Sequence, residues 1–177
     1  KEFAEMGKYV DQAMRDGALG MSTGLIYIPG TYAKTEELIA LSKIVAKHGG
    51  MYVSHMRSEG EEIFDAVDEV ARIGREANLP VHISHLKLAG KPMWGKHEKL
   101  LKALNKIRSE RIRLTHDQYA YTASSTGIQQ MIPSDSRSSG RKAFADLLSD
   151  PEKKKILVTK MKERVKQKGG DSYDYAV

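Results

Sequence analysis

The sequence predicts an α/β fold of repeated βα units, amounting to about half of a TIM-type (β/α) barrel. Four stretches with strand character, at residues 20–23, 52–55, 82–85 and 113–116, share an apolar run, a hydroxyl residue and a polar end. Their last residues are 32, 30 and 31 positions apart. A strand, a helix and two loops take about thirty residues, so this spacing is that of a βα repeat. Because a barrel closes with eight units over at least ~200 residues, about four units form half of one.

Helical patterns fill the intervals between these stretches. We expect the first helix to begin at Thr35 as its N-cap and to end at Gly49. The second should begin at Ser58, which stands in capping-box spacing with Glu61, and a third should span residues 97–109. Each helix places apolar residues on one face, namely Leu38, Leu41, Val45, Ile63, Val67, Val70, Leu100, Leu101, Leu104 and Ile107. Right-handed crossovers between such units give a parallel sheet.

The pattern changes after Pro133. Two further helices are predicted at residues 140–149 and 151–168, with Asp150 as the N-cap of the second and Pro151 at its first position. We therefore expect a partial barrel over residues 1–133, a helical insertion or lid over residues 134–170, and the start of a strand over residues 171–177.

Composition is that of a globular domain, with 177 residues, 40% hydrophobic and 29% charged. The absence of cysteine excludes disulfides and thiolate metal sites built from this chain. No apolar run approaches the ~20 residues that cross a bilayer, so no membrane partner is expected. A cytoplasmic location is favoured, although the chain begins without Met and a targeting segment would lie upstream.

The net charge of +6 comes from one region. Residues 135–168 contain 11 basic and 5 acidic side chains, and a solvated helix face is the ordinary explanation of such a run. Phe144 is the single aromatic residue there that could stack on a base. A basic module that binds an acidic partner or nucleic acid is the alternative from another functional class, but we expect no nucleic-acid partner.

Two histidines occupy equivalent positions in the repeat. His55 and His85 end the second and third strand stretches. In a parallel βα structure the side chains at the carboxyl ends of strands point into the active site. Neutral imidazole is a common ligand of zinc, and two such ligands on neighbouring strands would lie within bridging distance of one ion. The repeat therefore predicts a partial metal site.

The residues that follow the histidines also repeat. Residues 54–60 and 84–90 share the pattern S-H-[ML]-[KR]-x-x-G, which places Arg57 and Lys87 two positions after each histidine. Both cations would return to the side of the metal, where they could hold a substrate carboxylate. The alternative is that these side chains make ordinary surface hydrogen bonds.

The other histidines are weaker candidates. His116 falls at the repeat position, but it is followed by Asp117, which could be the inward residue instead. His82 stands three residues before His85, so strand alternation predicts that it points away from the metal, toward the helix layer.

Four stretches, taken in order and spacing, resemble the N-acyl-D-amino-acid deacylase (D-aminoacylase) family of the amidohydrolase superfamily. They are residues 17–30 (GALGMSTGLIYIPG), 50–60 (GMYVSHMRSEG), 81–87 (VHISHLK) and 117–127 (DQYAYTASSTG). The resemblance extends over essentially the whole chain as an internal segment of that family. It departs at Ala120, where a proline is common in the family, and this change would loosen the loop.

The resemblance implies a site and a cofactor. It assigns His55 and His85 as zinc ligands, with one or two Zn²⁺ ions in the complete enzyme, while the chain alone need not contain an ion. It implies that Lys87 holds the substrate carboxylate, with Arg57 nearby. The remaining implied contacts are Tyr119, Tyr121 and Ser125 at the carboxylate, and Ile26 and Tyr27 in the side-chain pocket. Residues 133–168 would correspond to the family's inserted lid.

The implied reaction is metal-dependent hydrolysis of an N-acyl-D-amino acid to a carboxylate and a free D-amino acid. The family also uses an H-x-H pair, a bridging ligand, and an Asp general base that is expected downstream. No catalytic residue is therefore expected within this chain, which alone should be inactive. A dihydroorotase-like or hydantoinase-like cyclic amide hydrolase is the alternative enzyme. Self-association through the uncovered surfaces of a half barrel is a further expectation.

Overall fold

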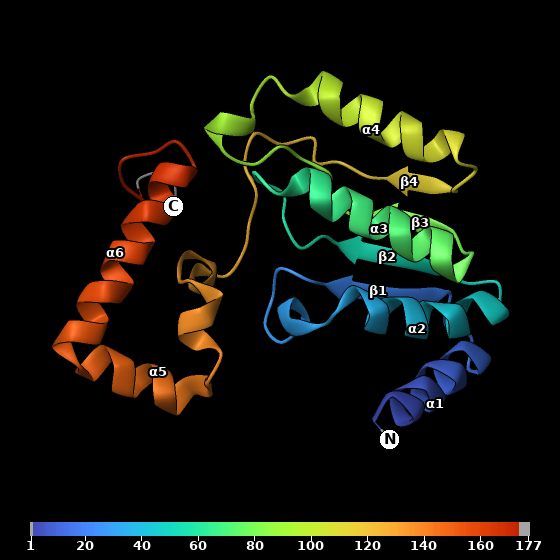
Figure 1. Ribbon diagram of the computed structural model, residues 1–177, viewed down its shortest axis with the longest axis horizontal. Coiled ribbons are helices and arrows are strands. Elements are labelled where there is room, and N and C mark those ends of the chain that lie inside the picture. The colour runs from blue at the N-terminus through green and yellow to red at the C-terminus, as the bar shows by residue number, and fades with distance from the viewer. Residues whose placement is uncertain (1, 174–177) are drawn as a thin grey trace. The chain divides into compact units, whose positions relative to one another are not determined.

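Four parallel strands form one sheet in the order β1-β2-β3-β4 (Figure 1). The computed structural model describes residues 2–173. The strands are β1 (Gly20–Gly24), β2 (Met51–His55), β3 (Val81–Ile83) and β4 (Leu114–His116). Their order in the sheet follows their order in the chain, which is the arrangement of consecutive βα units. The predicted α/β fold with a parallel sheet is confirmed.

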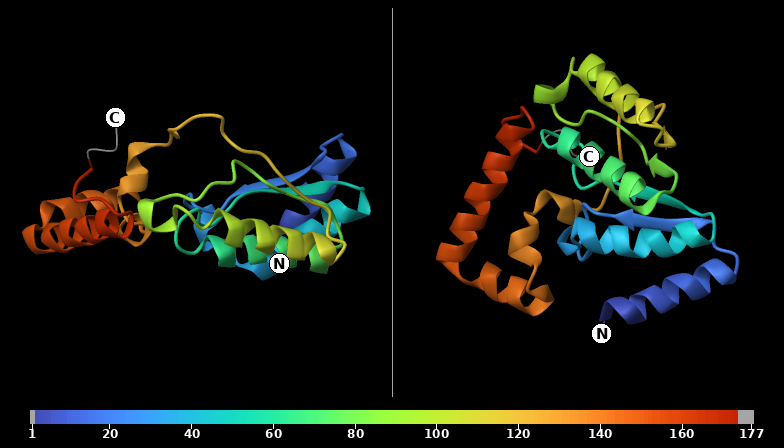
Figure 2. Two further views of the ribbon diagram at one scale, coloured as in Figure 1. Left: turned by 90° about the horizontal axis from the view of Figure 1, so that it is seen from above. Right: turned by 45° about the vertical axis from the view of Figure 1, so that its right-hand side comes forward.

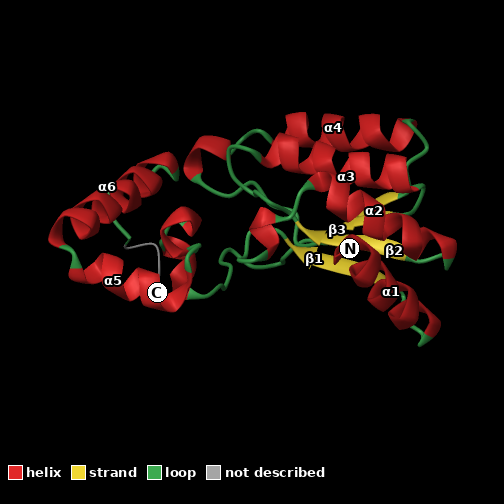
Figure 3. Cartoon of the chain, turned by 60° about the horizontal axis from the view of Figure 1, so that its bottom comes forward, coloured by secondary structure: helices red, strands yellow, loops and turns green. Residues whose placement is uncertain are grey.

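Helices cover one face of this sheet. In Figures 1 and 3, α2, α3 and α4 lie side by side over the strands, and α1 contacts α2. Their bounds are α1 (Glu2–Arg15), α2 (Thr35–Lys47), α3 (Ile63–Ala77) and α4 (His97–Ser109). These elements belong to one compact unit, which comprises residues 2–88 and 95–120.

The core lies between the sheet and these helices. Tyr52, Val81 and Ile83 are fully buried on the strands, as are Val67 and Val70 on α3 and Val45 on α2. The approach of α3 to β3 is close, because a Cβ added to Gly74 would lie 2.9 Å from Cγ1 of Val81. Burying these side chains fixes the register of the strands, since a slip by one residue would turn each of them to the opposite face.

The predicted start of one helix and the predicted N-cap of another were wrong. Helix α3 begins at Ile63 with Glu62 as its N-cap, because the hydroxyl of Ser58 accepts a hydrogen bond from the backbone N–H of Gly60 and forms a turn instead of a capping box. Helix α2 does begin at Thr35, but Lys34 is its N-cap, and the Thr35 hydroxyl donates to Glu69 on α3. The segment of residues 58–62 is therefore a loop.

Residues 89–94 and 121–173 form a second compact unit. Its helices α5 (Gly140–Ser149) and α6 (Pro151–Gln167) follow one another through a bend (Figure 2). As predicted, Asp150 caps α6, since its carboxylate accepts hydrogen bonds from the N–H groups of Glu152 and Lys153. Residues 171–173 are not in a strand, and the remainder of the strand expected at 171–177 lies outside the described residues.

Short 3₁₀ helices complete the elements, and their bounds are Gly30–Tyr32, Lys91–Met93, Ile128–Met131 and Ser134–Arg137. Over residues 2–173, no helix combines the length and the apolar character needed to cross a membrane.

The hydroxyl of Tyr52 connects β1 and β2 within the core. It lies 2.6 Å from Oγ1 of Thr23 and donates to Oγ of Ser54. Burial raises the pKa of the Tyr52 phenol, so the group stays neutral and keeps its proton.

Replacing Tyr52 with Phe should lower the free energy of unfolding by about 1–3 kcal/mol, because the ring still fills the core while Thr23 and Ser54 lose a partner. Urea unfolding would measure the change. Tyr9→Phe is the matched control, since Tyr9 on α1 is 71% exposed and should cost less than about 0.5 kcal/mol. Equal costs for the two variants would contradict the role given to the Tyr52 hydroxyl.

Candidate metal centre

The carboxyl ends of β2 and β3 bring two imidazole rings together. His55 is the last residue of β2, whereas β3 ends at Ile83 and the chain reaches His85 through a turn in which His85 has φ of +41°. The ring centroids of His55 and His85 lie 4.3 Å apart in an edge-to-face arrangement.

A carboxylate lies close to the two rings. Oε1 of Glu59 lies 2.7 Å from Nδ1 of His85, and one ligand atom from each of His55, Glu59 and His85 lies within 4.8 Å of the others. Two imidazoles and a carboxylate are a donor set that suits zinc and similar divalent ions. All three side chains are only partly accessible to solvent.

Sequence reasoning missed Glu59 for two reasons. The expected capping box placed it in the first turn of a helix, and the equivalent position of the second repeat is Ala89, so no repeat marked it. The signal that could have found it is its position four residues after His55, in a loop beyond a strand end.

The ring of His55 is suited to metal binding. Its Nε2 is buried and has no hydrogen-bond partner among the described residues. Burial, partly opposed by Glu59, lowers the pKa of His55, so the ring is neutral at pH 7 and can offer a lone pair. A buried ring nitrogen without a partner is costly unless something binds it, and a metal ion would. The residues present therefore fit a metal ion.

Lys87 lies beside these groups. Its ammonium forms an ion pair with Glu59, lies 3.0 Å from Nδ1 of His85, and stands 4.9 Å from the ring centroid of Tyr119. The Tyr119 ring is in turn 5.5 Å from the ring of His85. The ring of Tyr27 lies 4.8 Å from that of His55, and Ile26 is half-buried in the same loop. The structure thus gathers Tyr27, Lys87 and Tyr119 around the two histidines.

Arg57 does not extend toward this group, contrary to the prediction that it returns to the metal side. Its guanidinium makes two hydrogen bonds with Glu69 of α3 and donates to the backbone oxygens of Thr31 and Ala33. The reason is that the carboxylate of Glu69, whose side chain is only 10% exposed, accepts two hydrogen bonds from the guanidinium in a bidentate pair. The repeat pattern could not reveal this partner. Arg57 therefore joins α3 to the segment before α2.

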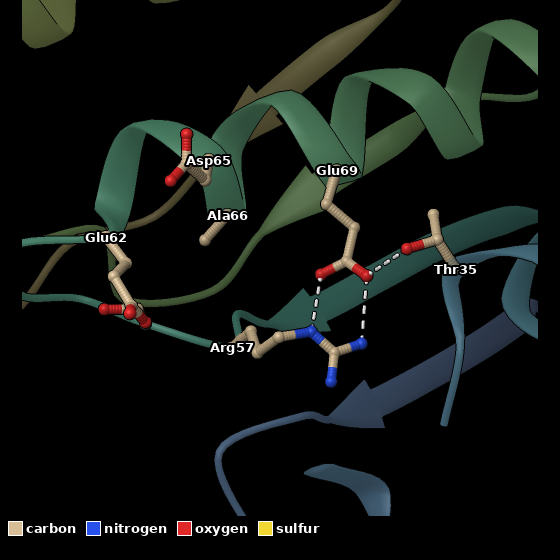
Figure 4. Close-up of a pocket in the computed structure, with 7 residues that line it drawn as sticks. Thr35, Arg57, Glu62, Asp65, Ala66 and Glu69 are labelled. Carbon is tan, nitrogen blue, oxygen red and sulfur yellow. Dashed lines mark hydrogen bonds and ion pairs between the residues drawn. The ribbon is translucent and has the colours of Figure 1, made fainter. Parts of the chain in front are cut away.

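A hollow of about 280 Å³ lies beside the Arg57–Glu69 pair. Figure 4 shows Glu69 reaching from α3 to both Arg57 and Thr35. The hollow is lined by Thr35, Arg57, Ser58, Glu62, Asp65, Ala66 and Glu69, and by none of the three grouped candidate ligands.

The predicted direction of His82 was wrong. Val81 and Ile83 are buried toward the helices, so His82 lies on the other face, where its Nε2 donates to Asp117 and its Nδ1 lies 2.8 Å from Oγ1 of Thr115. Strand alternation does not extend from His82 to His85, because β3 ends at Ile83 and a turn follows.

Asp117 stabilises that turn, because its carboxylate accepts a hydrogen bond from the backbone N–H of His85. Its neighbour His116 has a buried Nδ1 without a hydrogen-bond partner and is not grouped with the other candidate ligands within the described residues. Tyr121 and Ser125 are exposed and belong to the second unit, so their predicted substrate contacts stay predictions.

Comparison with characterised proteins gives three similar sequences, all from Alcaligenes xylosoxydans xylosoxydans. A D-aminoacylase is 42% identical over 130 residues, an N-acyl-D-glutamate deacylase is 36% identical over 126, and an N-acyl-D-aspartate deacylase is 35% identical over 129. These matches cover 73%, 71% and 72% of this chain, but 27%, 26% and 26% of the relatives. The chain therefore spans about a quarter of their length. No family model matches the chain.

The solved structures that superpose on this chain are also of D-aminoacylases and an N-acyl-D-glutamate deacylase. A D-aminoacylase crystal structure, described as defining a novel subset of amidohydrolases, superposes with a TM-score of 0.67 at 40% identity, covering 70% of this chain and 26% of that one. An N-acyl-D-glutamate deacylase from Bordetella bronchiseptica, complexed with zinc and a phosphonate inhibitor, gives a TM-score of 0.65 at 32% identity, covering 68% and 25%. Another D-aminoacylase structure, with a TM-score of 0.66 at 39% identity, is described as having a binuclear metal centre and covers 68% and 25%.

Glu69→Gln should lower the free energy of unfolding by about 1–3 kcal/mol, because Arg57 loses a partly buried charged acceptor. Urea unfolding would measure the loss. Glu76→Gln provides the control, since Glu76 pairs with Arg72 on the exposed side of the same helix and should cost less than about 1 kcal/mol. A Glu69→Gln variant as stable as the Glu76→Gln variant would show that the Arg57 pair does not stabilise the fold.

Proposed function

The chain is a relative of the D-aminoacylases and N-acyl-D-amino-acid deacylases, and from this relationship we propose that it forms the metal-binding part of such a deacylase. The supporting observation is the convergence of His55 and His85, with ring centroids 4.3 Å apart, at one edge of a parallel sheet. The buried and unpartnered Nε2 of His55 adds to it.

The proposal includes the form of the complete fold. Four parallel strands with helices on one face, carried by a chain that spans about a quarter of its relatives, suit consecutive units of a (β/α) barrel. The face of the sheet opposite the helices carries polar side chains such as Ser22, His82 and Thr115, which would line the barrel interior. We assign residues 134–170 to a lid over the open end of that barrel.

In this proposal His55 and His85 hold the metal, which we take to be Zn²⁺. Zinc bound there would polarise the amide carbonyl and lower the pKa of water to near neutrality. The lowered pKa of His55 suits this role, because the neutral ring can ligate without first losing a proton.

Lys87 is proposed to bind the carboxylate of an N-acyl-D-amino acid. An ammonium has three N–H donors, and Glu59 accepts one of them, so Lys87 can still donate to a substrate. Tyr119 lies against Lys87, and we place it at the same carboxylate. Ile26 and Tyr27 follow β1 beside His55, and we propose that they contact the substrate side chain.

Replacing His55 or His85 with Asn should remove a metal ligand. The affinity for Co²⁺ or Zn²⁺ should therefore fall by more than the ~10–100-fold that is typical when a residue hydrogen-bonded to a ligand is lost. Competition with a chromophoric chelator would give the affinities. His97→Asn, at the exposed start of α4, is the control and should bind metal like the unaltered chain. Binding that does not depend on His55 or His85 would refute the metal site.

Lys87→Met in the complete enzyme should raise KM for an N-acyl-D-amino acid about 10–100-fold, as the loss of a charged hydrogen bond implies. Steady-state assays should compare this acid with its methyl ester, which has no carboxylate and should lose little. Lys102→Met, on the exposed side of α4, is the control, and metal content should be checked in each variant. An equal rise for acid and ester would argue against the assignment of Lys87.

A further inference from the structure

We infer that Glu59 is a positioning residue of this centre, which holds the His85 ring by its Nδ1–H and leaves Nε2 free to bind the metal. The same carboxylate holds the ammonium of Lys87. The inference rests on the proposed function and deepens it, because it gives the metal ligand and the substrate-binding cation a common anchor.

The contact between Glu59 and His85 requires a proton. Oε1 of Glu59 and Nδ1 of His85 lie 2.7 Å apart, which is a hydrogen-bond distance and not a contact that two lone pairs would tolerate. The two side chains are 15% and 16% exposed, so little water competes for this bond.

The alternative is that Nδ1 of His85 carries no proton and accepts a hydrogen bond from Lys87. The Nζ of Lys87 lies 3.0 Å from this nitrogen. In that case the lone pairs of Nδ1 and of the Glu59 carboxylate would face each other at 2.7 Å. The arrangement in which Nδ1–H and the ammonium both donate to Glu59 has no such conflict.

A ring nitrogen that donates its proton cannot ligate a metal, so Nε2 is the nitrogen of His85 that remains for the ion. A carboxylate that accepts the other N–H of a ligating histidine is a recurrent feature of metal sites, where it fixes the ring orientation and raises ligand basicity. Glu59 can reach His85 because the loop of residues 58–62 continues before α3 begins at Ile63.

The tautomer of His85 tests the inference without a metal ion. Long-range ¹H–¹⁵N NMR of the metal-free chain, at about pH 8 where free imidazole is neutral, distinguishes the Nδ1–H and Nε2–H forms. We expect the Nδ1–H form in the unaltered chain and a shift toward the Nε2–H form in Glu59→Leu. Glu61→Leu removes an exposed carboxylate from the same loop and should leave the tautomer unchanged.

An Nε2–H tautomer in the unaltered chain would overturn the inference, and this result needs no variant to fold. The inference would also be overturned if His85 kept the same tautomer in Glu59→Leu while the amide spectrum of that variant was otherwise native.

Co²⁺ alone distinguishes a positioning residue from a ligand. Glu59→Leu should weaken Co²⁺ binding about 10–100-fold while the visible absorption bands of the bound ion keep their positions. Bands that move would identify Glu59 as a direct ligand and overturn the inference. Co²⁺ binding that is insensitive to His55→Asn and His85→Asn would refute the proposed function instead, whereas the NMR result judges Glu59 separately.

Discussion

The parallel register of β2 and β3 is the constraint on which the centre depends. It pairs Ser54 with Ile83, so both strands end at one edge of the sheet. His55 follows Ser54 directly, and the turn held by Asp117 carries His85 to the same place. The register is maintained by buried side chains on the opposite side, and a slip by one residue would separate the two rings. Core packing therefore positions the candidate ligands.

Two ion pairs involve residues that follow β2, and they have different roles: one stabilises the fold and the other lies at the candidate metal centre. Arg57 is bound by Glu69 and by two backbone oxygens, which use most of its donors and stabilise the segment before α2. Lys87, at the equivalent position of the next repeat, instead pairs with Glu59 beside the histidines. Equivalent positions in a repeat thus acquire different roles, because the carboxylates that bind them are not repeated: Ala89 and Lys99 stand thirty residues after Glu59 and Glu69.

The different partners of Arg57 and Lys87 show how far the sequence could predict the structure. The period of about thirty residues predicted the parallel α/β sheet, and helix spacing predicted α4, α5 and α6, because both follow from regular geometry. The direction of His82 and the contribution of Glu59 could not be predicted, since both depend on irregular backbone. The prediction for His82 assumed that side chains alternate between the two faces of the sheet as far as His85, but the positive φ of His85 marks a turn. The turn at Ser58 places Glu59 in a loop.

The same contacts determine whether Asp117 or Glu59 could carry a proton in the proposed reaction. Amide hydrolysis needs a proton carrier with a free lone pair and a pKa near the working pH. Hydrogen bonding from His82 lowers the pKa of Asp117, which moves it away from that range, and the His85 N–H occupies its other oxygen. Glu59 is engaged by Lys87 and His85. Asp117 and Glu59 therefore serve to hold other residues, and neither suits the role of proton carrier in the proposed reaction.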